Sequence, residues 1–596
     1  MVFEATRQFY KIFDSDDRRR FQYILAGSSV GGLLDLVGLA AVAPFVAVAV
    51  RPELVTERGW LSVAYEQLPW GSPKNFVTAL GLVSFLLMSA TLLFRVFLYR
   101  STLKFAEALK RKLTVRLTRL YLAQPYQYFL GVHSNDLKKQ CSQEVNQVVQ
   151  GFLLPFASAV SKLSGSLILI LALLWLEPLV ALLFLFLFSF AVLFLYGRLS
   201  HVWEKEGEEH LHSGRGAERL LEQAFCGLRE LKLAGREQFV VRHLEKLTNS
   251  HQAAMTNFQL ASEIRVSALR FLGLGGLIAT TLILINSRED VAGFVPVLGV
   301  LLLAIYRLLP SLQAMLNALS RIRFSVPVLE SMNEALSLPY TDCPENSDCG
   351  ELPFTESLEV ANLSFRYPAQ DKIVLDQVSL SVACGSKVGI VGRSGSGKTT
   401  LLDLIAGLLP ADPWALRVDG VELEPGKIRA WRDSIGYVPQ KSFLLDDTVK
   451  ANIALGLEAD EVDIEKVEEV SRRADIHEFI MTLPNGYDSQ VGQNGTWLSG
   501  GQKQRISIAR ALYRSPKLLI LDEATNALDI FTEKRVLESI SDLQPALTII
   551  IVTHRLDPLK DCDTIHVLNG EGRLKASGTF DELMKSSWLF RKLAGS

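Results

Sequence analysis

The segment VGRSGSGKTT, residues 391–400 of this 596-residue chain, has the residue types and spacing needed to bind phosphate. It matches G-x-x-x-x-G-K-[ST], in which backbone N–H groups surround phosphate oxygens, the lysine reaches the β- and γ-phosphates, and the threonine can hold Mg²⁺. An apolar run precedes the segment and a helical pattern follows it, so the helix N-terminus adds a favourable dipole. The expected phosphate-binding residues are Gly392, Ser394, Gly395, Ser396, Gly397, Lys398, Thr399 and Thr400.

A pair of carboxylates could complete the chemistry. The segment KLLILDEATNALD, residues 517–529, places Asp522 and Glu523 at the end of an apolar run that is expected to be a strand. An acidic residue there can orient Mg²⁺, and a second carboxylate can polarise the water that attacks the γ-phosphate. Two carboxylates at a strand end are otherwise solvated surface groups. Beside a phosphate-binding loop, they predict a Mg²⁺-dependent hydrolytic site with Thr399 and Asp522 at the metal.

The segment WLSGGQKQRISIARAL, residues 497–512, is the most diagnostic part of the chain. It contains an intact LSGGQ signature, by which the chain resembles the ATP-binding cassette superfamily over roughly residues 357–590. The signature residues are Leu498, Ser499, Gly500, Gly501 and Gln502. The resemblance implies that ATP is the cofactor and that the signature contacts the γ-phosphate held by a second cassette. One complete cassette per chain then implies a homodimer with two equivalent sites, with a heterodimer as the alternative.

Further motifs of this superfamily occur in its usual order. The resemblance implies that Tyr367 of FRYP stacks on adenine and that Gln440 of GYVPQ touches Mg²⁺ and the transmembrane part. It also implies that Glu523 is the catalytic base and that Asp529 lies in the loop facing the partner cassette. His554 of VTHR would sense the γ-phosphate. We therefore expect Glu523, His554 and Gln440 to surround the reacting phosphate.

Two departures from the superfamily pattern stand out. Gln493 and Asn494 occupy the place where exporters usually carry a Glu-Arg pair, and Asn526 stands where serine is commoner. The first departure puts in doubt a charged contact with the intracellular helices. The hydrolytic residues named above are all present, so we expect ATP hydrolysis to be retained.

The first half of the chain is rich in apolar runs long enough to cross a bilayer, which takes about 20 residues. Basic residues 18–20 precede the first run and the stretch 100–120 follows the second, which places both flanks in the cytoplasm. The loop between these two runs is then external. Its Trp60, Tyr65 and Trp70 suit either a short amphipathic surface helix or a loop with interfacial aromatic anchors. The six candidate spans are residues 22–50, 76–99, 152–175, 178–198, 264–286 and 292–325.

These features predict a multidomain membrane protein. An all-α six-span domain, residues 1–333, is followed by a linker, residues 334–355, and by an α/β P-loop NTPase cassette, residues 356–596. The polar stretches 100–150 and 199–262 have helical periodicity and predict cytoplasmic extensions, with reversals at 123–137 and 216–235. The arrangement resembles an exporter-type half-transporter, which implies a domain-swapped dimer. We expect a multi-pass protein of a bacterial inner (plasma) membrane, with its N-terminus and cassette in the cytoplasm.

The cargo is expected to be an amphipathic lipid. Residues 227–244 and 304–326 resemble lipid-linked oligosaccharide flippases of the PglK group, which implies a polyprenyl-pyrophosphate-linked oligosaccharide. At 1.5 Å per residue, Arg95, Arg270 and Arg307 lie roughly 28, 24 and 22 Å below the external span ends. Three arginines at similar depth could bind a pyrophosphate head-group, or could extend to lipid phosphates at the inner leaflet. Asp35, in the first span, could pair with one of them.

Other functions are less well supported by the sequence. The alternative cargoes for the same architecture are drugs, peptides or lipid A, and a membrane protein gated by ATP is a further possibility. A net charge of −2 with scattered Lys and Arg gives no reason to expect a nucleic-acid partner. Six cysteines occur without a CxxC pair or a histidine cluster, which argues against a zinc site. Cys343 and Cys349 are expected to be reduced in a cytosolic linker rather than bridged.

Overall fold

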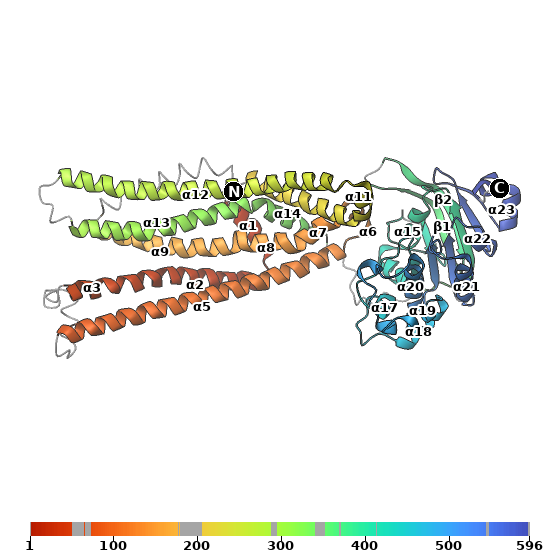
Figure 1. Ribbon diagram of the computed structural model, residues 1–596, viewed down its shortest axis with the longest axis horizontal. Coiled ribbons are helices and arrows are strands. Elements are labelled where there is room, and N and C mark those ends of the chain that lie inside the picture. The colour runs from red at the N-terminus through yellow and green to blue at the C-terminus, as the bar shows by residue number, and fades with distance from the viewer. Residues whose placement is uncertain are drawn as a thin grey trace. The chain divides into compact units, whose positions relative to one another are not determined.

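A computed structural model describes residues 2–50, 65, 73–176, 178, 205–287, 295–339, 352–368, 371–412, 414–543 and 547–593. The chain divides into two compact units. The helical unit comprises Met1–Gln124 and Val132–Tyr340, and the α/β unit comprises Pro125–Gly131 and Thr341–Ser596. Figure 1 shows the elements of both, and each unit is described by itself.

The helical unit is built from long helices that run side by side (Figure 1). α5 and α12 have 50 and 51 residues, which at 1.5 Å per residue is about 75 Å. A hydrocarbon core is about 30 Å thick, so both helices extend well beyond a bilayer, as the polar stretches predicted. The helices are α1 (Val2–Ile12), α2 (Ser15–Ala40), α3 (Val42–Val50), α5 (Pro73–Leu122), α7 (Ser134–Lys139), α8 (Val145–Val148), α9 (Leu154–Leu176), α11 (Leu228–Ala234), α12 (Glu237–Ser287), α13 (Val295–Phe324) and α14 (Val326–Leu336), with residues 205–226 also helical.

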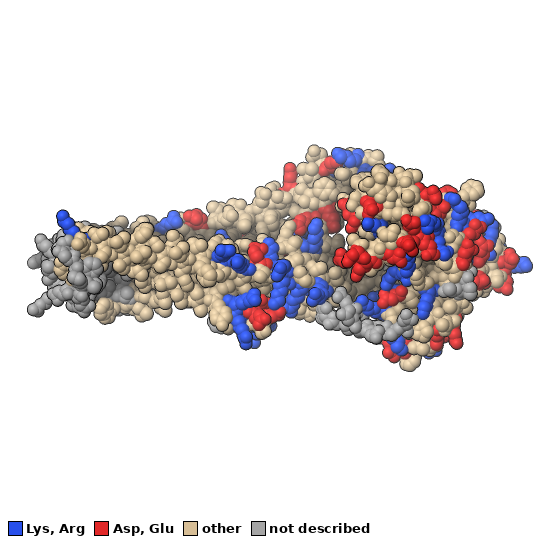
Figure 2. Space-filling view, turned by 90° about the horizontal axis from the view of Figure 1, so that it is seen from below, with Lys and Arg blue, Asp and Glu red and all other residues tan. Residues whose placement is uncertain are grey.

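Most of the candidate spans fall within these helices. Among the described residues, two helices, Lys74–Leu122 and Ser134–Leu171, are long and apolar enough to cross a membrane. Span 178–198 lies outside the described residues except for residue 178, as do Trp60, Trp70 and the two linker cysteines. The ring of Tyr65 packs edge-on against Phe76. On the face shown in Figure 2, charged side chains are sparse toward the left end of the helical unit, which suits a lipid-exposed surface.

Small residues let two of these helices approach closely. A Cβ at Gly32 of α2 would collide with the backbone oxygen of Ser161 on α9. Ser164 donates a hydrogen bond from Oγ to the Ser29 oxygen at 3.2 Å. A Cβ at Gly165 would lie 3.0 Å from the Gly32 oxygen. Glycine and serine therefore set the α2–α9 distance, as they commonly do between membrane helices.

The α/β unit contains two sheets. β1 (Ser357–Arg366), β2 (Ile373–Ala383), β4 (Leu416–Val418) and β5 (Val421–Glu422) form an antiparallel sheet in the order β2-β1-β4-β5. The second sheet has the order β10-β9-β3-β8-β7-β6, and β10 alone of these six strands runs antiparallel to its neighbour. Its strands are β3 (Lys387–Gly392), β6 (Ile435–Val438), β7 (Leu518–Asp522), β8 (Thr548–Val552), β9 (Thr564–Leu568) and β10 (Leu574–Gly578).

Every residue of β3, β7 and β8 is buried, because a parallel sheet is covered on both faces. These three strands are neighbours, so their carboxyl ends meet at one edge of the sheet. The sequence segments with predicted chemistry follow two of them directly. The helices of this unit are α6 (Tyr126–Gly131), α15 (Lys398–Ile405), α16 (Ile428–Asp433), α17 (Val449–Ile453), α18 (Ile464–Arg473), α19 (His477–Thr482), α20 (Gly500–Tyr513), α21 (Ile530–Ser541), α22 (Asp557–Lys560), α23 (Phe580–Ser586) and α24 (Trp588–Leu593).

Candidate nucleotide-binding site

The predicted phosphate loop connects the end of β3 to the start of α15. Gly395 and Gly397 have φ of +78° and +90°, which side chains rarely adopt. A Cβ at Gly397 would also lie 2.7 Å from Leu375 Cδ2. Glycine is therefore required at Gly397 both by the backbone conformation and by the close approach of β2. The resulting loop turns backbone N–H groups at the N-terminus of a helix toward one site.

Lys398 and Ser396 are two of the buried polar side chains of this segment. The Lys398 ammonium donates to the oxygens of Gly392 at 2.9 Å and Arg393 at 3.2 Å. Burial lowers the pKa of Lys398, while Glu523 and Asp522 act to raise it. Ser396 Oγ is buried and has no hydrogen-bond partner among the described residues. An orphaned hydroxyl beside an ammonium fits a phosphate oxygen, which could accept from both.

The expected metal ligands meet at the end of β7. Thr399 Oγ1 donates to Asp522 Oδ2 at 3.1 Å, and Tyr437 OH donates to the same oxygen at 3.4 Å. Burial raises the pKa of Asp522, although the Thr399 hydroxyl opposes the rise. Hydroxyl and carboxylate oxygens are suitable ligands for Mg²⁺. Thr399 and Asp522 would therefore hold the ion that accompanies ATP, and that ion would neutralise phosphate charge.

Glu523 is the centre of a group of three donors. Gln440 Nε2 donates to Glu523 Oε2 at 2.7 Å, and Asn526 Nδ2 donates to the same oxygen at 3.0 Å. His554 Nε2 lies 2.9 Å from Glu523 Oε1. The structure thus brings together the three residues expected at the reacting phosphate, and adds Asn526. Such an arrangement orients a carboxylate that could accept a proton from water.

Tyr367 lies at the same end of the unit. Its hydroxyl is 3.1 Å from Thr400 Oγ1, and its ring packs edge-on against Phe365. Sequence reasoning did not identify two neighbouring groups, Asp403 and Tyr437. Burial and the nearby Asp522 raise the pKa of Asp403 to about 6. A lone aspartate in the helix after a phosphate loop has no spacing signal, so only its burial distinguishes it.

The LSGGQ signature occupies the N-terminus of α20. Ser499 caps the helix, because its Oγ accepts from Gln502 N at 3.3 Å while Gln502 Oε1 accepts from Ser499 N at 2.7 Å. Ser499 and Gly500 are nevertheless exposed, and Leu498, Gly501 and Gln502 are half-buried. Just upstream, Asn494 has a φ of +51°, and its oxygen accepts from Lys503 Nζ at 2.8 Å. The signature therefore presents a helix N-terminus to solvent.

The loop that carries Asp529 is held by an arginine that the sequence motifs did not identify. Asp529 caps α21 by accepting from Thr532 N at 3.0 Å, which lowers the pKa of Asp529. Arg555 Nη1 donates to Glu533 Oε2 at 2.6 Å and to the Leu528 oxygen at 3.1 Å. Its Nη2 donates to the Asn526 oxygen at 3.1 Å. Arg555 thus holds this loop at Asn526 and Leu528 and ties it to Glu533 of α21.

The three candidate head-group arginines have different surroundings. Arg95 and Arg270 are exposed on α5 and α12. Arg307 of α13 is half-buried and lines a small hollow between helices. The hollow is also lined by Lys162, Gly32, Ser161, Ser166 and Ser311. The Asp35 side chain lies outside the described residues, so its expected pairing is not placed.

Comparison with known proteins identifies the second unit. Residues 375–526 match the family described as ABC transporter. This unit carries an ABC transporter ATP-binding domain. The chain is 33% identical over 376 residues to the ATP-dependent lipid A-core flippase of Alkalilimnicola ehrlichii, covering 61% of this chain and 62% of the relative. It is 43% identical over 236 residues to the protein of that name in Pseudomonas fluorescens, covering 40% and 39%.

The fold of the whole chain has a solved counterpart. A bacterial Atm1-family ABC exporter, solved with ATP bound, matches with a TM-score of 0.79 over 98% of this chain and 99% of that one, at 22% identity. The predicted fold class, a helical unit followed by an α/β P-loop NTPase unit, is therefore confirmed. The chain spans about three fifths of the first relative above and about two fifths of the second.

Proposed function

We propose that this chain is one half of a homodimeric ABC exporter that uses ATP hydrolysis to move a phosphate-bearing amphipathic lipid across a membrane. The observation that carries the hydrolytic part is the grouping of Gln440, Asn526 and His554 around Glu523, next to a loop with an orphaned Ser396 hydroxyl. Bound Mg²⁺-ATP supplies the phosphoanhydride bond whose cleavage drives the cycle. Lys398 would neutralise phosphate charge, and Glu523 would accept the proton of the attacking water.

The dimer is supported by surfaces that a single chain leaves open. The exposed signature would complete the nucleotide site of a second copy. A groove on the α/β unit is lined by the half-exposed apolar side chains of Leu455 and Leu457, with Tyr437 and Arg510. The reversal near residues 216–235 exposes Phe225 and Leu233, 70% and 80% of their surface. We infer that the reversal of one copy docks in the groove of the other, which would join the cassettes to the membrane helices as expected for an exporter.

The proposed cargo is defined by a phosphate group on its head, which both candidate classes of lipid share. Relatives named ATP-dependent lipid A-core flippase support the lipid A alternative better than the polyprenyl-pyrophosphate that the sequence resemblance implied. Both classes of lipid carry phosphate on sugar or polyprenol. Lys162 and Arg307 line a hollow in which Ser166 Oγ is buried without a hydrogen-bond partner. Cationic and hydroxyl donors at membrane depth suit an anionic head-group, with Arg95 and Arg270 as further candidates from the sequence.

The proposal also covers the location of the protein in the cell. We infer an integral membrane protein with its N-terminus and ATP-binding domain in the cytoplasm, as the basic flanks predict. This orientation places the nucleotide site where ATP is available. The bacterial inner membrane stays a prediction.

Transport into proteoliposomes tests the function. We expect ATP to drive translocation of fluorescent lipid A, with less translocation of a dephosphorylated analogue, and the Glu523→Gln variant to be inactive. Replacement of Arg95, Arg270 or Arg307 by glutamine should raise the lipid concentration needed for half-maximal transport. The cargo proposal fails if none of the three replacements changes translocation. It also fails if lipid A and its dephosphorylated analogue are translocated equally well. A polyprenyl-pyrophosphate oligosaccharide, assayed in parallel, separates the two lipid classes.

A further inference from the structure

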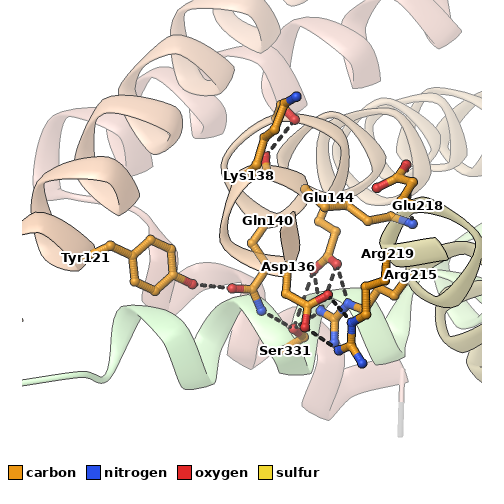
Figure 3. A network of polar contacts seen from close by, with 11 residues as sticks. Tyr121, Asp136, Lys138, Gln140, Glu144, Arg215, Glu218, Arg219 and Ser331 are labelled. Atoms are coloured by element: carbon orange, nitrogen blue, oxygen red, sulfur yellow. Dashed lines mark hydrogen bonds and ion pairs between the residues drawn. The ribbon is translucent and has the colours of Figure 1, made fainter. Parts of the chain in front are cut away.

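A buried ion pair joins the intracellular ends of the helical unit. Glu144 is 1% exposed and accepts from Arg215 Nε at 2.8 Å on Oε1 and from Arg215 Nη2 at 2.9 Å on Oε2. Arg215 belongs to the helical residues 205–226, so the pair connects segments 71 positions apart. Figure 3 shows the two side chains meeting between helices. Replacing such a pair by apolar groups is often neutral or stabilising, so stability alone does not explain why it is there.

The pair also holds a third helix, through a single hydroxyl. Ser331 of α14 accepts from Arg215 Nη2 at 2.7 Å and from Gln140 Nε2 at 3.0 Å, and donates to Glu144 Oε2 at 3.4 Å. A serine hydroxyl has one donor and two acceptor positions, so these three bonds use its full capacity. Gln140 in turn accepts from the Tyr121 hydroxyl of α5. Three helical segments therefore meet at Ser331, and α5 joins them through Gln140 (Figure 3).

The local backbone supports this arrangement. Gln140 and Glu144 begin and end a π-helical turn, Gln140–Glu144, and a second one covers Val149–Leu153. Single π-helical turns are rare and occur frequently at functional positions. α14 ends at Leu336 and is the last described helix before the α/β unit resumes in sequence. One of the three chain connections between the two units therefore runs through α14, and the other two flank Pro125–Gly131.

We propose that Glu144, Arg215 and Ser331 form a latch that makes α14 move as one body with the intracellular helices, and so couples ATP hydrolysis to cargo movement. The inference rests on the proposed exporter function. Glu144 and Arg215 act as positioning residues, because they contact neither nucleotide nor cargo in the proposed mechanism. Loss of the latch should leave ATP hydrolysis intact and separate it from the motion of the helical unit.

The chain contains a matched control. Arg219 forms a bidentate ion pair with Asp136, in which Arg219 Nε donates to Asp136 Oδ1 at 2.9 Å. This pair joins the same two segments, one turn along the helix from Arg215 (Figure 3). Its two hydrogen bonds join Arg219 to Asp136 and do not involve α14. Removing it should weaken the same helix–helix junction without releasing Ser331.

The test compares Ser331→Ala, Ser331→Thr, the Glu144→Gln/Arg215→Gln double variant, and the Asp136→Asn/Arg219→Gln control in full-length protein. Lipid A transported per ATP hydrolysed is measured in proteoliposomes. We expect Ser331→Ala and the Glu144/Arg215 variant to lower this ratio at least fivefold, the lower end of usual coupling between sites. Their KM for ATP should not change. Ser331→Thr, which keeps the hydroxyl, and the control should couple as the wild type does.

A second readout does not depend on the cargo. A spin label at Thr78→Cys, in a cysteine-free background, reports the distance between copies near the outer end of α5 with and without ATP. We expect ATP to change this distance in the wild type and the control, and at least half of that change to be lost in Ser331→Ala. Normal coupling and a normal distance change in Ser331→Ala would overturn the latch, as would an equal loss in the control. Wild-type protein that changes distance but transports no lipid would instead contradict the proposed cargo.

Discussion

Arg555 offers the sharpest test of how the nucleotide site is held. Its partner Glu533 has a side chain only 5% exposed, Arg555 bonds its Oε2, and Oε1 has no hydrogen-bond partner among the described residues. Arg555→Gln would therefore leave a buried carboxylate without its cation. Removing one partner of a buried pair costs about 3–5 kcal/mol. Because Arg555 keeps 35% of its side chain exposed, we expect about 3 kcal/mol, the lower end of that range.

For a unit of this size, 1 kcal/mol lowers the melting temperature by roughly 2–4 °C, so the first unfolding transition should fall by about 6–12 °C. The assay is thermal unfolding of the purified chain followed by intrinsic fluorescence, with ATP hydrolysis measured alongside. Adding Glu533→Gln removes the buried charge, so the double variant should recover most of the loss. If Arg555→Gln and the double variant have the same melting temperature, the ion pair does not stabilise this loop and the reasoning is wrong.

Three further outcomes are expected. Glu523→Gln should lower the hydrolysis rate by about 10²–10⁴-fold, the usual contribution of a general base, while equilibrium dialysis shows ATP still bound. Gly397→Ala, which must keep φ near +90° and meet Leu375, should weaken ATP binding measured by the same dialysis. Burial and the neighbouring His251 lower the pKa of His210 to about 4 in the folded protein, against about 6.5 in the unfolded chain. The contribution of His210 to folding stability is therefore complete above about pH 6.5 and is lost as the pH falls from about 6.5 toward 4. His210→Gln should flatten that pH dependence in unfolding experiments, and an unchanged slope would exclude His210 as its source.

The residues of the candidate nucleotide site could be proposed from the sequence because they follow local patterns. Gly397 and Lys398 are adjacent, and their conformation follows from a strand, a turn and a helix N-terminus in direct succession. Asp522 and Glu523 could be placed at a strand end because the apolar run before them is continuous. Parallel neighbouring strands then bring these segments to one sheet edge without further information.

Contacts between distant segments could not be predicted in the same way. Asn526 departs from the usual serine, yet its amide donates to Glu523 beside Gln440. The Glu144–Arg215 pair joins segments that are separated in sequence by the two candidate spans 152–175 and 178–198, and each residue alone is an ordinary helical charge. Burial decides their role, and burial depends on which helix faces pack together.

The arginines of α12 show why depth in the membrane is not enough to assign a function. Arg265 and Arg270 are five residues apart, which turns the helix by about 140° and separates them by about 7.5 Å along its axis, so they face different surroundings. Arg265 is fully buried against α13, where it donates to Asn317 Oδ1 at 3.0 Å and to Ser320. Arg270 is exposed. A cargo-binding role therefore suits Arg270 and not Arg265, and this choice required the helix pairing rather than the hydropathy of the span.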